Sequence, residues 1–237
     1  MAAIAKRLKG GLGLLALALM VAACAPFAPA PEEPPDYMAW EAHQRDLAML
    51  QAWSLDGRVA LRTPDDAWSA SLRWSQWVDY MDFRLRGTFG IGATRVRGDP
   101  GWVVIENSRG ETWQTAEPER ELALQTGWQV PLGMLRWWII GLPYPDEEPA
   151  YLAVNGGGQL SELHQGGWTI EYDRYETVDG LALPGRITVD NELEGVTLRL
   201  RVSEWVLGDR TGGPDFAGVD SQQGAWAVIP GQDQPDE

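Results

Sequence analysis

The chain has 237 residues, which fits one large domain or two small ones. Its 34 acidic residues outnumber the 19 basic ones and give a formal net charge of −15, which disfavours nucleic acid as a partner because phosphate binding needs clustered cations. A single cysteine excludes an internal disulfide framework and a cysteine-rich metal site. Two histidines leave little material for the commonest catalytic chemistry, whereas 13 tryptophans supply bulky apolar surface.

Residues 1–23 have the three parts of a secretory signal peptide: a basic start, an apolar run and small residues before Cys24. The run is shorter than the ~20 residues that a membrane-spanning helix needs. The sequence Val21-Ala22-Ala23-Cys24 resembles the cleavage box of bacterial lipoproteins, which implies that Cys24 is acylated. Ala25 replaces the aspartate associated with inner-membrane retention, so the resemblance favours the outer membrane. An ordinary signal peptide with a chance cysteine is the alternative.

The composition of the next residues predicts a tether followed by a folded domain. Residues 24–37 are rich in proline, which is typical of an extended linker. From Met38 to Trp53, apolar residues recur at spacings of three and four, which predicts a helix. We expect the folded domain over residues 38–208. Residues 209–237 are rich in glycine, proline and acidic residues and predict a disordered acidic tail.

From Leu55 onward, apolar residues alternate with polar ones at a period of two. In the segment from Val196 to Val202, for example, every second residue is apolar and two of the others are arginine. Each strand therefore has one apolar face and one solvated face, as is typical of antiparallel sheets. Turn signals such as Asn155-Gly156 and Asp179-Gly180 favour hairpins over parallel strands joined by helices.

Two more helices are expected, over Pro118–Thr126 and Pro131–Ile140, because each segment begins with proline and is followed by glycine. About eleven strands and only three short helices predict a mainly β fold, with a curved or barrel-like sheet whose apolar side is covered by the helices. Periodicity alone leaves open whether the interior is filled or hollow.

The sequence contains no motif of a serine hydrolase elbow, a zinc protease, a redox dithiol or a phosphate-binding loop. His43 and His164 belong to no shared motif, and Glu147-Glu148 has the pattern of solvated loop charge. We therefore expect no enzyme, no cofactor and no metal site.

Several segments, in order, resemble the LolB family of outer-membrane lipoprotein receptors. They are Leu55-Asp56-Gly57-Arg58-Val59-Ala60, Gly127-Trp128-Gln129-Val130-Pro131-Leu132 and Trp138-Ile139-Ile140-Gly141-Leu142-Pro143, together with the box at Cys24. The resemblance implies an open antiparallel β-barrel of eleven or so strands, with three helices over an apolar cavity. It also implies a monomer, lipid-anchored in the outer membrane and facing the periplasm. Such a receptor takes lipoproteins from a soluble LolA-like carrier and places their acyl chains in outer-membrane lipid.

The resemblance implies two functional regions. The first is a protruding loop at residues 87–90, in which Phe89, with Thr88 and Gly90, serves membrane insertion. Phe89 stands where leucine is usual and Thr88 where proline is common, so the stiffening by proline is not carried over; a packed position for Phe89 is the alternative. The second is the cavity, for which the candidate lining residues are Trp68, Leu72, Trp74, Met81, Phe83, Leu85, Leu198, Leu200 and Val202. About half of these are expected to fill the core.

Three other functions are compatible with a lipid-anchored β domain. The main alternative is a module with a filled core that binds a protein or an envelope polymer, and a second is an anchored esterase. A membrane-spanning barrel is disfavoured because Arg199 and Arg201 would lie on its lipid-facing side, at a cost of roughly 2–4 kcal/mol each at the midplane. The acidity fits either a basic patch on the carrier or a saline habitat.

Overall fold

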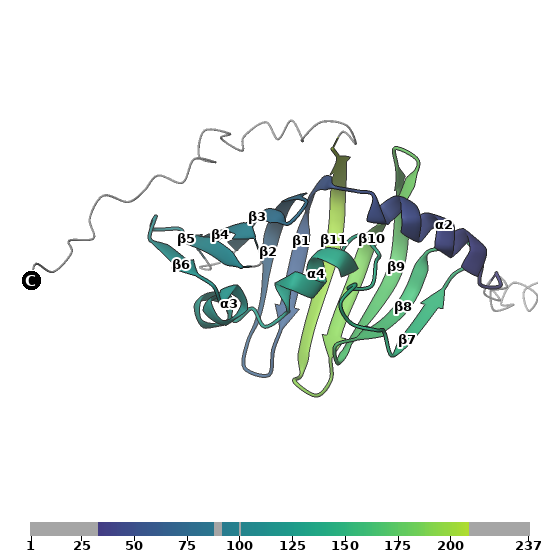
Figure 1. Ribbon diagram of the computed structural model, residues 1–237. Helices are drawn as coiled ribbons and strands as arrows, with labels where there is room; N and C mark the ends of the chain where they lie inside the picture. The colour runs from purple at the N-terminus through teal and green to yellow at the C-terminus, as the bar shows by residue number, and fades with distance from the viewer. Residues whose placement is uncertain (1–32, 88–91, 100, 209–237) are drawn as a thin grey trace, which may run out of the picture. The chain divides into compact units, whose positions relative to one another are not determined.

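A computed structural model describes residues 33–87, 92–99 and 101–208, and those from Pro34 onward belong to one compact unit. They form one sheet and three helices, α2 (Tyr37–Ala48), α3 (Pro118–Thr126) and α4 (Leu132–Trp138) (Figure 1). None of these helices is both long and apolar enough to cross a membrane. The strands are β1 (Ala52–Arg62), β2 (Ala67–Trp77), β3 (Tyr80–Gly87), β4 (Ala93–Asp99), β5 (Trp102–Asn107), β6 (Thr112–Thr115), β7 (Tyr151–Val154), β8 (Leu160–Gln165), β9 (Trp168–Val178), β10 (Leu181–Asn191) and β11 (Val196–Leu207).

The eleven strands lie in the order β6-β5-β4-β3-β2-β1-β11-β10-β9-β8-β7, and every neighbouring pair is antiparallel. The first and last described strands, β1 and β11, are paired in the middle of the sheet. Strands β6 and β7 are its two edges, so the sheet is not closed into a barrel. The predicted mainly β fold, with an open sheet of about eleven strands and three helices, is therefore confirmed.

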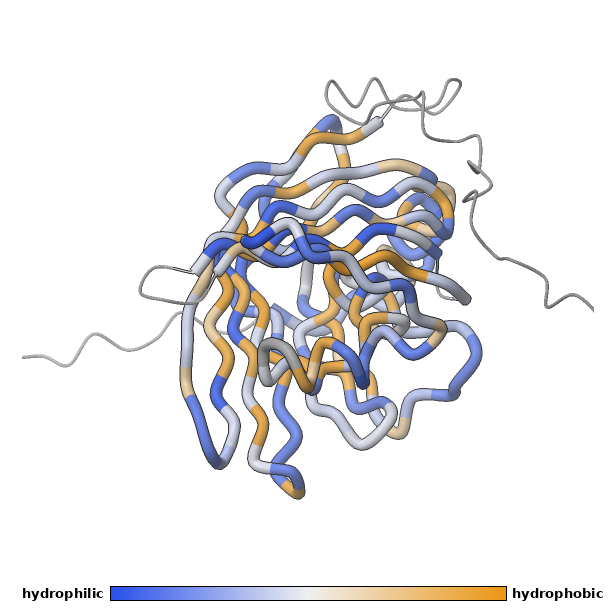
Figure 2. The backbone as a smooth tube through the Cα atoms, turned by 90° about the vertical axis from the view of Figure 1, so that its left-hand side faces the viewer, coloured by the Kyte–Doolittle hydropathy of each residue, from blue (hydrophilic) through white to orange (hydrophobic). Residues whose placement is uncertain are grey.

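The predicted alternation corresponds to an inner, apolar face and an outer, polar face of the sheet. Figure 2 shows the change of hydropathy from residue to residue along the strands. The register places apolar residues opposite one another on the inner face, as in Val59 opposite Leu200 and Trp74 opposite Phe83. Buried residues of all three helices, including Leu47, belong to the same continuous core as this face. The helices therefore provide the cover that a one-sided sheet requires.

Helix α2 is shorter than the sequence predicts. The side chain of Asp36 caps its N-terminus by accepting a hydrogen bond from the Ala39 backbone N–H at 2.9 Å. The helix ends at Ala48, whereas the apolar spacing predicts a helix as far as Trp53. Trp53 instead lies in β1, opposite Leu207 of β11, and is 2% exposed. The prediction was wrong here because burial of the indole in the sheet outweighs a local helical pattern.

A β-bulge lies where β1 meets β11. Asp56 is opposite Glu204 and Gly57 is opposite Val202, so Ser203 is an extra residue on β11. The Ser203 hydroxyl donates to the backbone carbonyl of Asp56 at 2.9 Å, which fixes the bulge. A Cβ atom on Gly57 would lie 2.6 Å from the backbone oxygen of Arg201, so only glycine permits this close approach of the two strands.

We expect Gly57→Ala to lower the free energy of unfolding by about 1–3 kcal/mol, because the new methyl group has to displace the β11 backbone. Gly133→Ala is the matched control: it lies in α4, and its added Cβ would meet nothing within 4 Å. That change should stabilise the protein by roughly 0.5–1 kcal/mol through helix propensity. Urea denaturation measures both, and equal stabilities for the two variants would contradict the account of the bulge.

His43 on α2 is half-buried against β10. Burial lowers the pKa of its imidazole, and Asp46 and a hydrogen bond to the backbone of Ala182 oppose this effect only in part. The Nε2 atom is buried without a hydrogen-bond partner among the described residues. Because the folded pKa is below the unfolded one, the unfolded chain binds the proton more readily at acidic pH. Stability is therefore lost as the pH falls from about 6.5.

We expect His43→Gln to reduce the decrease in Tm that acidification from about pH 7.5 to about pH 5 causes, because the variant has no imidazole to protonate. Differential scanning calorimetry of both proteins across this range measures the effect. An unchanged decrease would show that other groups account for the acid sensitivity.

Candidate functional site

All nine predicted lining residues lie on the inner face of the sheet, on strands β2, β3 and β11. These strands are close together, because only β1 lies between β2 and β11. Eight are buried and belong to the continuous core, and Trp68 is partly buried against it. The sequence pattern therefore identified the correct face of each strand. That these residues hold acyl chains stays a prediction.

Aromatic rings form a continuous row along this inner face. Neighbouring ring centroids are 5.5–6.3 Å apart, within the range of favourable aromatic contacts. In order, the row consists of Trp205, Trp53, Trp74, Phe83, Trp128 and Trp68. The candidate set did not include Trp53, Trp128 and Trp205. Trp53 was missed because it seemed to end a helix, and Trp128 because it comes from the connection between α3 and α4, which no strand periodicity reaches.

Most indole N–H groups of the row are satisfied inside the protein. Trp74 donates to Gln76 Oε1 at 3.0 Å, Trp128 to the carbonyl of Val130 at 2.8 Å, and Trp205 to a β10 carbonyl at 3.0 Å. Trp68 differs, because its Nε1 is buried and has no hydrogen-bond partner among the described residues. A buried donor without an acceptor is costly, so it marks a place where a polar group of another molecule would be stabilised.

A second buried donor without a partner is Nε1 of Trp137 on α4. The guanidinium of Arg136 lies 5.2 Å from the centroid of the Trp137 ring and also pairs with Asp79 at 2.8 Å. These contacts connect α4 to the turn between β2 and β3.

The C-terminal end of α4 is held by one buried amide. Gln165 of β8 accepts from Trp138 Nε1 at 2.9 Å and from the Tyr144 backbone N–H at 2.8 Å, and it donates to the Tyr144 carbonyl at 2.8 Å. The hydroxyl of Tyr172 donates to the Trp138 carbonyl at 3.0 Å, and burial raises the pKa of this phenol. These hydrogen bonds attach the C-terminal end of α4 to strands β8 and β9.

The titratable residues form no catalytic arrangement in the described part of the chain. His43 lies on α2, whereas His164 lies on β8 and pairs with Glu162 at 2.6 Å. Glu147 accepts from the Gly166 backbone N–H at 2.8 Å, which gives this predicted loop acid a structural contact. Within the same residues, no group of three potential ligands is placed to hold a metal ion.

Two predicted sites lie outside the described residues. They are the lipidation site at Cys24 and the membrane-insertion loop with Thr88, Phe89 and Gly90. The strands on either side of that loop are paired, with Arg86 opposite Ala93, so residues 87–92 connect neighbouring antiparallel strands.

Comparison with known proteins gives consistent matches. A family model described as "Outer membrane lipoprotein LolB" matches residues 51–205. The Outer-membrane lipoprotein LolB of Pseudomonas putida (strain W619) is 39% identical over 170 residues, which cover 72% of this chain and 82% of the relative. That of Stutzerimonas stutzeri (strain A1501) is 36% identical over 187 residues, or 78% and 90% of the two chains. A crystal structure of a LolA superfamily protein from Nitrosomonas europaea aligns with a TM-score of 0.47 at 12% identity, covering 72% of this chain and 94% of that one.

Proposed function

Because this chain belongs to the outer membrane lipoprotein LolB family, we propose that the inner face of its sheet receives the acyl chains of lipoprotein cargo. As a member of this family it is an outer-membrane receptor in lipoprotein localisation and not an enzyme.

The chemistry of the cargo explains why such a receptor needs an apolar interior. A triacylated lipoprotein with ~45 methylenes would cost on the order of 35 kcal/mol to expose to water. Transfer between two apolar sites avoids this cost and is nearly neutral. A difference in affinity of ~1.4 kcal/mol between carrier and receptor then suffices for a tenfold preference in one direction.

The observation that carries this proposal is the aromatic row on the inner face, which ends at a half-buried tryptophan with a free donor. Trp68 lies beside Trp128, with ring centroids 6.3 Å apart. Its Nε1 atom would be 4.0 Å from a Cβ atom placed on Gly127, so it faces the connection between α3 and α4. We place the entry of the acyl chains here, with the Trp68 N–H donating to an ester carbonyl of the cargo.

We propose the following division of the chain and its partners. Residues 1–23 are the signal peptide and residues 24–37 the tether, anchored by acylated Cys24, which would reach about 50 Å if fully extended. The last two residues of this range, Asp36 and Tyr37, already belong to the start of α2. Residues 38–208 bind cargo, and residues 209–237 form an acidic tail. A LolA-like carrier delivers the lipoprotein, and outer-membrane lipid receives it. Delivery occurs through Phe89, whose large apolar ring suits insertion between lipids.

A fluorescent fatty-acid probe should bind wild-type protein saturably, near one equivalent, and a triacyl lipopeptide should displace it. Trp68→Phe keeps the ring but removes the donor, so its affinity for the ester-bearing lipopeptide should fall by roughly three- to tenfold. Affinity for an ether-linked analogue should change much less. The matched control is Trp102→Phe on β5, where the ring is 42% exposed and lies outside the row.

Absence of saturable probe binding to wild-type protein would favour the alternative of a β module with a filled core. Equal losses for the ester and ether ligands would refute the donor role of Trp68 alone, since a loss of packing would affect both.

We expect Phe89→Glu to leave probe binding and uptake of cargo from the carrier intact while reducing release into liposomes more than tenfold, because a carboxylate opposes insertion into lipid. The control is Leu193→Glu in the turn between β10 and β11, where the leucine is 96% exposed. Fluorescence transfer of a labelled lipoprotein measures release. Delivery by Phe89→Glu at the wild-type rate would show that another segment contacts the membrane.

A further inference from the structure

The outer face of the sheet, which the proposed function does not use, carries a cleft of about 800 Å³. Its lining comes from strands β1, β2, β3, β9 and β11. Six arginines line it: Arg58, Arg73, Arg84, Arg86, Arg174 and Arg201. Only two carboxylates, Asp56 and Glu176, line it as well. This concentration of positive charge is notable on a chain whose formal charge is −15.

The strand register places arginines of this face directly opposite one another. Arg174 is opposite Arg186, Arg186 is opposite Arg201, and Arg201 is opposite Arg58. Neighbouring strands are about 4.8 Å apart, so four positive charges follow one another across β9, β10, β11 and β1. Like charges directly opposite in a sheet are destabilising. This arginine row is therefore an arrangement that folding alone does not favour.

Part of the charge in the cleft is not compensated by the protein itself. Arg73 pairs with Asp56 at 2.8 Å and Arg174 with Glu176 at 3.1 Å. In the described part of the chain, no carboxylate lies within 4.0 Å of the charged nitrogens of Arg58, Arg86 or Arg201.

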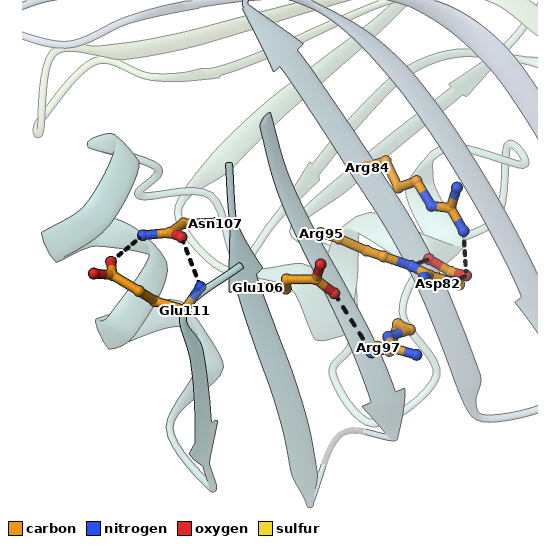
Figure 3. Close-up of polar contacts among 7 residues, drawn as sticks. All are labelled: Asp82, Arg84, Arg95, Arg97, Glu106, Asn107 and Glu111. Atoms are coloured by element: carbon orange, nitrogen blue, oxygen red, sulfur yellow. Dashed lines mark hydrogen bonds and ion pairs between the residues drawn. The ribbon is translucent and has the colours of Figure 1, made fainter. Parts of the chain in front are cut away.

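Several arginines on strands β3 and β4 are paired with carboxylates. Figure 3 shows Asp82 between Arg84 and Arg95, and Arg97 beside Glu106 on the next strand. Arg95 is joined to Asp82 by two hydrogen bonds. Asp82 also pairs with the cleft residue Arg84 at 3.5 Å, so three of the six cleft arginines have a carboxylate partner, whereas Arg58, Arg86 and Arg201 have none among the described residues.

The cleft offers hydrogen-bond donors but no exposed apolar anchor. Its two apolar lining residues, Leu72 and Val202, are only 3% and 5% exposed. Protein docking sites draw most of their affinity from buried aromatic and aliphatic groups, which this surface lacks. Guanidinium groups in a row instead match phosphate oxygens, which accept paired hydrogen bonds from arginine.

We infer that this cleft binds the phosphate groups of anionic membrane lipids and so turns the outer face of the sheet toward the membrane surface. The inference rests on the outer-membrane location of the family and not on cargo binding. The acidic remainder of the chain is repelled by an anionic surface, so a localised positive cleft selects one orientation. In that orientation the helices over the inner face point away from the lipid, toward an arriving carrier.

The test is sedimentation of residues 34–237, whose described part up to residue 208 has its own continuous core, with vesicles of phosphatidylcholine alone or with about 30% phosphatidylglycerol. We expect binding only to the anionic vesicles, and binding that weakens with salt. Arg58→Gln with Arg201→Gln should lower the partition coefficient roughly twenty-five-fold, or about fivefold for each charge.

Arg62→Gln with Arg199→Gln is the matched control, because these exposed arginines lie on the same two strands outside the cleft. It should lower partitioning by less than about fivefold, through the general field of the face alone. Both double variants should bind the acyl probe normally and have a Tm no lower than wild type, and the cleft variant should be slightly more stable because it relieves the repulsion between opposed arginines. This separates failure of the lipid inference from failure of the proposed cargo site.

Three results would overturn the inference. Equal losses in the two double variants would show that only general charge matters. Complete competition by inorganic phosphate at constant ionic strength would identify a free anion as the ligand. The third is that deletion of residues 209–237 strengthens vesicle binding while the double variant Arg58→Gln with Arg201→Gln binds vesicles as well as wild type. This would show that other surfaces contact the lipid. Selective loss in the cleft variant alone supports it.

Discussion

The need to cover one apolar face of a wide antiparallel sheet determines most of this structure. Every strand of the central region presents apolar residues inward and polar residues outward, so the inner face has to be shielded from water. Three short helices and the segments between them supply that shield, with Trp128 and Trp138 among its buried residues. Because the two faces are separate, a single layer of strands can carry both proposed sites, an apolar one on the inner face and a positively charged one on the outer face.

The fold could be predicted because its determinants are local. Alternation over Val196–Val202 identifies a strand and its buried face from the sequence alone, and glycine turns mark the hairpins. The end of α2 could not be predicted. Trp53 belongs to a strand because it pairs with Gln76 and Leu207, which are distant in sequence. Strand order likewise needed the structure, since the pairing of β1 with β11 joins the two ends of the domain.

The candidate site was predictable only in part. The inward residues of β2, β3 and β11 follow from period two, but Trp128 comes from a connection without periodicity. The significance of Trp68 depends on an N–H group that lacks an acceptor, which no sequence pattern reports. The arginine row was likewise visible only as solvated charge until the register placed Arg201 between Arg58 and Arg186.

The two unpaired edges of the sheet have a mechanical consequence. Strands β6 (Thr112–Thr115) and β7 (Tyr151–Val154) are four residues each and are the outermost members of the sheet, with no seam of hydrogen bonds between them. A sealed cylinder has its radius fixed by strand number and shear. An open sheet can flatten or curl through small changes in twist, while all hydrogen bonds between its neighbouring strands are kept. If the inner face receives acyl chains as proposed, an open sheet could therefore accommodate cargo whose chains differ in length and number.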